Sequence, residues 1–195
     1  MSTGSEIAVR RVRADEWRRV RALRLEALVD PDAEMAYFDT FDESSARTDG
    51  FWMQRAADAS TGRFAAQFVA VDGEAWVGSA TGLVREAGSI DHLGRTVATR
   101  RVDVVGVYVR PSARGAGLID RLLQAVAAWA GERGADRVTL DVHADNLRAQ
   151  AAYRRVGFVE TGTRYTGPIG DELEMMWVPA GGPPAGDGPA GIVPA

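Results

Sequence analysis

The sequence predicts a single α/β or α+β domain with a mixed β-sheet and helices on both faces. Three observations lead to this prediction. Strand-like segments and helical segments alternate along most of the chain. The Asp72-Gly73 pair, between two strand-like runs, is typical of a hairpin turn. A strand, a helix and a strand follow one another from Arg101 to His143, which predicts a right-handed crossover between two parallel strands.

The N-terminal part is predicted to hold one strand and two helices. After the strand, apolar residues recur at three- and four-residue spacing, which is typical of an amphipathic helix. Pro31 separates this helix from a weaker one, whose apolar side is expected to hold Phe51 and Trp52. The predicted elements are a strand at 7–12 and helices at 14–29 and 43–59.

The other predicted elements complete the sheet and add two helices. Pro111 ends one strand and Gly157 ends the last helix. Residues 85–99 are rich in glycine and charge and are expected to form a loop. The strands are predicted at 64–71, 75–84, 101–109, 137–143, 158–164 and 172–178, and the helices at 117–133 and 146–156.

Composition argues against several classes of protein. A net charge of −4 disfavours a nucleic-acid partner. Acids and apolar residues interleave with the arginines between Arg10 and Arg24, as on a solvated helix face. The chain has no cysteine and only two distant histidines, so we expect no disulfide and no metal site. No apolar run is long enough for a signal peptide or a membrane span, so we expect a cytoplasmic protein without a membrane partner.

The composition changes sharply after Pro179. Residues 180–195 are mainly glycine, proline and alanine, and they cannot bury enough apolar surface to offset the entropy of ordering. We therefore expect a folded domain at 1–179 and a disordered tail at 180–195.

The stretch VYVRPSARGAGLIDRLLQAV, residues 107–126, indicates an anion site. Arg114, Gly115, Ala116 and Gly117 lie between a strand and a helix. Helix N-termini present unpaired N–H groups, glycines allow a phosphate to approach closely, and an arginine adds a charged donor. The loop lacks the GK[ST] of a P-loop and a full GxGxxG. A turn that merely connects two elements is the alternative.

A second signature lies in LDVHADNLRAQAAYRRVGF, residues 140–158. It has the spacing N-x-x-A-x-x-x-Y-x-x-x-G-F, with Asn146, Ala149, Tyr153, Gly157 and Phe158 at the defining positions. Together with the R-x-x-G-x-G/A loop, this resembles the GNAT N-acetyltransferases, in which the loop binds the pyrophosphate of CoA. The resemblance covers Val102 to Phe158 well, whereas Ile7 to Val84 match only in the order of elements.

The resemblance implies a GNAT-like fold and a reaction. The fold is a twisted, mostly antiparallel sheet of about seven strands with a central parallel pair and helices on both faces. The reaction is transfer of acetyl from acetyl-CoA to a primary amine of a small molecule or protein, by direct attack in a ternary complex and without a metal. A homodimer is possible on family grounds. A non-catalytic acyl-CoA-binding or sensory module and an interaction domain are the alternatives.

The loop departs from the family pattern at Ile119, where a small residue is expected. This side chain could crowd the pyrophosphate, or it could turn inward beside Leu122 and Leu123, which we expect. Backbone amides from Ala116 through Asp120, including that of Leu118, would then still bind the cofactor. Asp120 is expected to point to solvent because its charge would repel phosphates.

The resemblance also implies roles in holding CoA. The backbone of Val107, Tyr108 and Val109 would pair with the pantetheine arm like an added strand. Asn146 would bond the pantetheine amides, cap the following helix, or do both. Tyr153 would be the general acid that protonates the departing thiolate. Gly106 lies just upstream of Val107, where it marks either a bulge in the strand or a simple relief of crowding.

The general base is left open. If side chains alternate between the two faces of the strand, Asp103 lies on a face that is otherwise apolar. A lone acid on such a face indicates a functional residue, and a residue at the exposed start of the strand is the alternative. That face is expected to hold Val105, Val107 and Val109. His143 is the rival and His92 a weaker candidate, and the base could also act through water.

The acceptor amine is expected to bind the parts of the chain that match the GNAT pattern only weakly. Acids and aromatic residues there would suit a cation with some apolar body, and a solvated loop is the favoured alternative. The candidates are Glu34, Tyr37, Phe38, Asp39, Phe41, Asp42, Glu43, Glu172 and Glu174.

Overall fold

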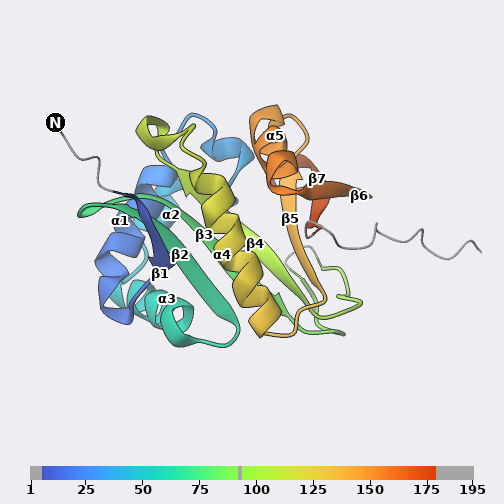
Figure 1. Ribbon diagram of the computed structural model, residues 1–195, viewed down its shortest axis with the longest axis horizontal. Coiled ribbons are helices and arrows are strands. Elements are labelled where there is room, and N and C mark those ends of the chain that lie inside the picture. Colours follow the sequence, from blue (N-terminus) through green and yellow to red (C-terminus); the bar gives the residue numbers. More distant parts are fainter. Residues whose placement is uncertain (1–5, 92–93, 179–195) are drawn as a thin grey trace, which may run out of the picture.

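A computed structural model of the chain, which describes residues 6–91 and 94–178, contains one seven-stranded sheet with helices on both faces (Figure 1). The strand order is β1-β2-β3-β4-β5-β7-β6, and only β4 and β5 pair in parallel. This confirms the predicted fold. The strands are β1 (Ala8–Arg11), β2 (Ala65–Asp72), β3 (Ala75–Arg85), β4 (Arg101–Val109), β5 (Arg137–His143), β6 (Phe158–Gly167) and β7 (Gly170–Trp177). The predicted tail at 180–195 lies outside the described residues.

The helices differ from the prediction mainly near the N-terminus. The helix predicted at 43–59 is two helices, because Thr40 and Thr48 each cap a separate start. The helix predicted at 14–29 opens with a 3-10 turn and ends at Ala27. Trp52 is buried as expected, but Phe51 is exposed. The helices are α1 (Trp17–Ala27), α2 (Phe41–Ser45), α3 (Asp49–Thr61), α4 (Leu118–Glu132) and α5 (Leu147–Val156), with 3-10 turns at Ala14–Glu16, Ala33–Met35 and Pro111–Ala113.

Two apolar clusters hold the layers together, one on each face of the sheet. On one face α4 buries Leu122 and Val126 against Val102 and other sheet residues. On the other face Trp52 of α3 and Val20 of α1 are buried almost completely. Burial of a large apolar side chain stabilises a fold by about 1.5–3 kcal/mol, so both helical layers are fixed to the sheet. No helix in the described part of the chain is long and apolar enough to cross a membrane.

Strands β4 and β5 separate soon after they meet. Their parallel pairing covers only Arg101 to Asp103 of β4, and β4 then continues to Val109 without β5 beside it. Gly106 lies at φ +61° where the pairing with β3 shifts by one residue, so the predicted bulge is confirmed. The bulge gives β4 extra twist, and a gap opens between the two central strands.

The same bulge corrects one prediction about strand faces. Val107 and Val109 pack with Val102 in the cluster under α4, whereas period-two alternation placed them with Asp103. One additional residue at the bulge reverses the alternation of every later side chain. Asp103 therefore does not share its face with Val107 and Val109.

The distance between α4 and the sheet depends on a glycine. A Cβ at Gly82 would lie 2.9 Å from Val126 Cγ1 and 3.1 Å from Trp129 Cζ3. We therefore expect Gly82→Ala to lower the free energy of unfolding by about 1–3 kcal/mol through overpacking. The control is Gly131→Ala in α4, where a Cβ meets nothing within 4 Å, and which should raise it by about 0.5–1 kcal/mol. Urea unfolding measures both, and equal stability of the two variants would contradict this close packing.

Candidate active site

A continuous cleft follows the gap between β4 and β5. It consists of an outer hollow of about 270 Å³ at the start of α4, a middle hollow of about 300 Å³ and an inner hollow of about 290 Å³. Arg114 and Ile119 line both the outer and the middle hollows. Tyr37, Asn146 and Tyr153 line both the middle and the inner hollows. The shared residues show that the three hollows adjoin in this order.

The outer hollow has the features of a phosphate site. Gly115 and Gly117 have φ of +84° and +68°, and a Cβ at either would meet nothing within 4 Å, so this backbone is open to a ligand. The N–H of Arg121 bonds the carbonyl of Gly117 at 3.2 Å, and the amides of the helix before it have no partner within the helix. These donors, with the positive end of the helix dipole, favour an anion.

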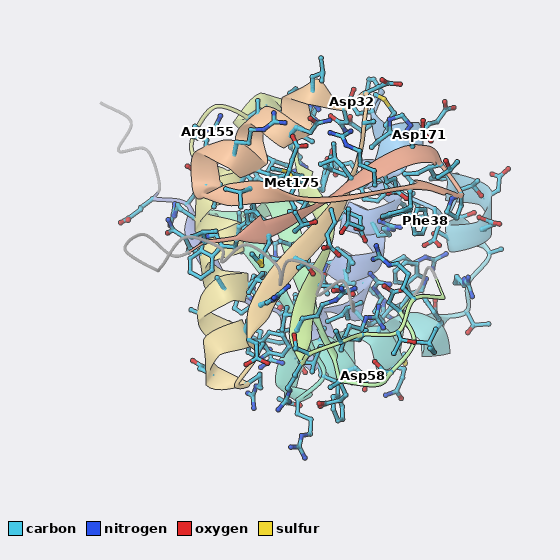
Figure 2. All side chains as sticks on the ribbon, turned by 90° about the vertical axis from the view of Figure 1, so that its right-hand side faces the viewer. Asp32, Phe38, Asp58, Arg155, Asp171 and Met175 are labelled. Atoms are coloured by element: carbon cyan, nitrogen blue, oxygen red, sulfur yellow. The ribbon has the colours of Figure 1, made fainter. Side chains whose placement is uncertain are left out.

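Arginines surround this end of the cleft, and aspartates of the segment after α1 bind two of them. The Arg114 guanidinium lies 2.6 Å from the carboxylate of Asp30 and donates through Nε to the carbonyl of Val109 at 3.0 Å. Arg148 pairs with Asp32. Figure 2 shows Asp32 and Arg155 at the same end of the molecule. The segment that carries both aspartates is therefore tied to the cleft by two ion pairs.

Two predictions at the start of α4 meet different outcomes. Ile119 packs against the core cluster as expected, but it also lines the outer and middle hollows. Asp120 is half-buried with its carboxylate 3.8 Å from Arg155, so the prediction that it points to solvent is wrong. The pull of the Arg155 cation explains this position. The side chain of Leu118 is buried, so only its backbone faces outward.

The middle hollow exposes the free edge of β4. Past Asp103 no strand of the described residues pairs with this edge, and the hydroxyl of Tyr37 donates to the carbonyl of Val107 at 2.9 Å. The side chain of Tyr108 lies on the opposite face, where its hydroxyl donates to Glu26 at 3.2 Å. Asn146 caps α5, because its Oδ1 accepts the N–H of Ala149 at 3.0 Å. The capping half of the prediction for Asn146 is confirmed.

Tyr153 lies where the middle and inner hollows meet. It is half-buried, and its ring is 6.1 Å from that of Phe158. Burial raises the pKa of Tyr153 to about 12, so the phenol keeps its proton at neutral pH. A protonated hydroxyl at this junction can donate a proton to a group held in the middle hollow.

The three candidate bases differ in their surroundings. Asp103 is 5% exposed, and its carboxylate accepts from Arg85 at 3.0 Å and from Thr139 at 3.0 Å, with Arg101 2.8 Å away. His143 lines the inner hollow, and its Nδ1 accepts the N–H of Asp145 at 3.1 Å. His92 lies outside the described residues.

Glu172 of β7 is a buried acid in the inner hollow. It is 3% exposed, and its Oε2 has no hydrogen-bond partner in the described part of the chain. Burial, followed by the nearby Asp141, raises the pKa of Glu172, while His143 and Arg95 oppose the rise. The turn between β6 and β7 makes room for these groups, since a Cβ at Gly170 would lie 2.6 Å from His143 Nε2.

The remaining acceptor candidates divide into two groups. Tyr37, Phe38 and Asp39 line the inner hollow. Glu174 instead joins an ion-pair network, with its carboxylate 3.4 Å from Arg101. The residues that do not line the inner hollow are Glu34, Phe41, Asp42, Glu43 and Glu174. Among the described residues no group of three or more histidine, cysteine, aspartate or glutamate side chains could hold a metal ion.

Residues 17–158 match the acetyltransferase (GNAT) family. The chain belongs to this family. An aminoglycoside N(6')-acetyltransferase of Stenotrophomonas maltophilia is 35% identical over 108 residues, which are 55% of this chain and 66% of that protein. The chain thus matches just under two thirds of that relative's length.

Solved GNAT structures share the fold. A GNAT-family acetyltransferase from Streptococcus pneumoniae superposes with a TM-score of 0.68 at 17% identity, covering 88% of this chain and 98% of that one. The putative acetyltransferase yncA of Salmonella typhimurium, determined with acetyl-CoA, has a TM-score of 0.66 at 16% identity, covering 94% and 99% of the two chains. At this identity the likeness shows the architecture alone.

Several lining residues of this GNAT cleft were not identified from the sequence. Asp30 and Arg148 come together from segments more than a hundred residues apart, and Arg55 reaches the inner hollow from a helix that gave only a weak signal. No local sequence pattern identifies such residues. A charged residue on a helix is typical of a solvent-exposed face, and only the folded structure shows which element packs against it. Asp141 had a local signal in the sequence, an acid between the apolar residues Leu140 and Val142 of a predicted strand.

The buried carboxyl of Glu172 predicts a pH-dependent stability. Because its pKa is raised in the folded protein, its contribution to stability is full below the ordinary pKa of a glutamate and is lost as the pH rises through the folded-state pKa. Glutamine stays neutral, so Glu172→Gln should gain melting temperature relative to wild type as the pH goes from 5 to 8. Glu74→Gln, in an exposed turn, is the control. If the difference in melting temperature between Glu172→Gln and wild type were the same at pH 5 and pH 8, the raised pKa of Glu172 would be contradicted.

Proposed function

We propose that this chain is an acetyl-CoA-dependent N-acetyltransferase that moves an acetyl group to a primary amine by direct attack in a ternary complex. The observation that carries the proposal is the position of Tyr153. Its protonated phenol lies where the middle hollow, which continues from the phosphate-like outer hollow, adjoins the inner hollow. Membership of the GNAT family and the acetyl-CoA in a structural relative support it. The named acceptor of the Stenotrophomonas relative makes aminoglycosides one acceptor class to test.

The cofactor would occupy the outer and middle hollows. The pyrophosphate would accept from the backbone of Gly115, Ala116 and Gly117 and from the first amides of α4, those of Leu118, Ile119 and Asp120. Arg114 would add a charged contact, which requires it to turn from Asp30 or to share its donors between two anions. The pantetheine arm would pair with the free edge of β4 at residues 107–109.

Asn146 and Tyr153 would complete the cofactor site. Both residues line the middle and the inner hollows, so they reach the part of the cleft where the thioester meets the amine. The Asn146 carbonyl oxygen is already used in the helix cap, and its amide N–H groups would serve the pantetheine.

The reaction needs one proton removed and one supplied. The amine loses a proton to a base, and its lone pair attacks the acetyl carbon to form the C–N bond. The C–S bond then breaks, and the sulfur receives a proton from the Tyr153 hydroxyl. The hydroxyl recovers the remaining surplus proton of the attacking nitrogen, directly or through a water molecule. The balanced outcome is an acetylated amine, free CoA and one proton released from the ammonium form.

The surroundings favour Glu172 as the base over Asp103. Two arginines and Thr139 already contact the carboxylate of Asp103, so an incoming amine would have to compete with them for its oxygens. Glu172 has an unpartnered buried oxygen and a raised pKa, which suits proton uptake. Asp103, which the sequence pattern indicated, and His143 remain the alternative candidates for the base. The cytoplasmic location and a homodimer stay predictions as well.

Binding of acetyl-CoA is the first test. At 100 times its dissociation constant a ligand stabilises a protein by about 2.7 kcal/mol, a rise of about 5–10 °C in melting temperature for a chain of this size. We expect this rise with acetyl-CoA, and a dissociation constant raised about tenfold or more in Arg114→Gln, because a charged hydrogen bond contributes about 1.5–3 kcal/mol. Isothermal titration calorimetry measures the constant, and Arg63→Gln, on an exposed turn, is the control. No shift at millimolar ligand would indicate an interaction domain instead.

Turnover tests the role of Tyr153. With an amine that the wild type accepts, we expect Tyr153→Phe to lower kcat about 100-fold or more, the usual share of a general acid, with little change in the KM for acetyl-CoA. Thiol release measures the rate. Unchanged kcat would remove Tyr153 from the mechanism. Acetyl-CoA binding without transfer to any amine of a broad panel would identify a non-catalytic acyl-CoA-binding module.

A further inference from the structure

The inner hollow is lined by charged side chains that mostly satisfy one another. Arg24 pairs with Asp39 at 3.1 Å, and Arg85 pairs with Asp103 at 3.0 Å. Asp141 lies 3.7 Å from a guanidinium nitrogen of Arg95. These pairs leave two charged groups of opposite sign, Arg55 and Glu172, to consider separately.

The first of these groups is the guanidinium of Arg55. It reaches the inner hollow from α3, is half-buried, and has no hydrogen bond or ion pair within the described residues. Its guanidinium carbon lies 6.0 Å from the centroid of the Trp52 ring. Burial and the nearby cation of Arg24 lower the pKa of Arg55, while the charge of Asp39, which is paired with Arg24, opposes them. An arginine nevertheless keeps its charge in proteins. A desolvated cation of this kind is stabilised by an anion, and its planar fork suits a carboxylate.

Glu172 is the matching unpaired acid, and it comes from the other side of the hollow. It lies on β7 at the register position opposite His143 of β5. Its Oε2 is buried and has no partner in the described part of the chain, so the cost of desolvating this oxygen is not offset within the protein. A primary ammonium, with three donors, would satisfy it.

We propose that the acceptor is a free amino acid, a small molecule that carries both a primary amine and a carboxylate. Its carboxylate binds Arg55 on α3, and its amine binds Glu172 on β7. The inference rests on the proposed acetyl transfer and names the substrate class for the same site.

The position of the junction fixes which end of the acceptor reacts. The thioester would lie beside Tyr153 and Asn146, which line both the middle and the inner hollows. His143, the cross-strand neighbour of Glu172, is three residues before Asn146, so the β5–β7 side of the hollow is the side near the thioester. The amine therefore faces the acetyl group, and the carboxylate lies toward α3.

The same charges disfavour other amines. A polyamine would bring a second cation toward Arg55, and like charges in a partly desolvated site repel. An amine without any acid group would leave Arg55 unpaired. Both kinds of acceptor would bind less well than an amino acid of the same size.

The test compares matched acceptors that differ only in the acid group. Thiol release at saturating acetyl-CoA is measured for α- and ω-amino acids, their carboxamides, the decarboxylated amines and a polyamine. We expect kcat/KM for the free acid to exceed that for its carboxamide about 10- to 100-fold, the range for a charged hydrogen bond of about 1.5–3 kcal/mol. The preference should vanish in Arg55→Gln, mainly through KM, and persist in part in Arg55→Lys. The control Arg63→Gln should leave it unchanged.

Different failures have different meanings. If carboxamides or plain amines are acetylated as well as the acids, or if the preference survives in Arg55→Gln, the amino-acid inference is overturned while acetyl transfer stands. If no amine is acetylated, melting temperatures with CoA plus each amino acid decide. A rise that Arg55→Gln abolishes would support the amino-acid site while acetyl transfer fails, and no rise would overturn both.

Discussion

The separation of β4 from β5 is the constraint on which the rest of the site depends. Three residues of β4 pair with β5, and the bulge at Gly106 then turns the strand away. A sheet with continuous pairing here would use the backbone edge of β4 for β5 and leave no room for a ligand. The gap supplies the cleft, a free β-edge and the space into which α5 brings Tyr153.

A network of ion pairs holds the end of the sheet where β4 and β5 still meet. The Asp91 carboxylate lies 2.8 Å from Arg95 and 3.0 Å from Arg101, and Arg101 also reaches Asp103 and Glu174. Buried charges are costly unless they are paired, and removal of one partner leaves the others uncompensated. This network accounts for an acid at Asp103 through structure, without requiring it to exchange protons.

The segment after α1 covers the open end of the cleft. Asp30 and Asp32 hold it to Arg114 and Arg148, and Tyr37 bonds the edge of β4 at Val107. These contacts use groups that a phosphate or a pantetheine arm would also use. In the proposed site, cofactor binding would therefore exchange partners at arginines and at a strand edge that already have partners, which would moderate the net gain from each new contact.

Within the sequence, local patterns determined the order and type of nearly all elements, the glycine-rich loop after β4 and the spacing from Asn146 to Phe158. These features depend on residues close in the chain, such as glycine at positive φ, helix caps and apolar periodicity. Only the tertiary structure decided which charges are paired. Arg114 meets Asp30, Asp103 meets two arginines, and Arg55 and Glu172 have no ion-pair partner among the described residues. Each outcome depends on segments far apart in sequence that the folded sheet and helices bring together.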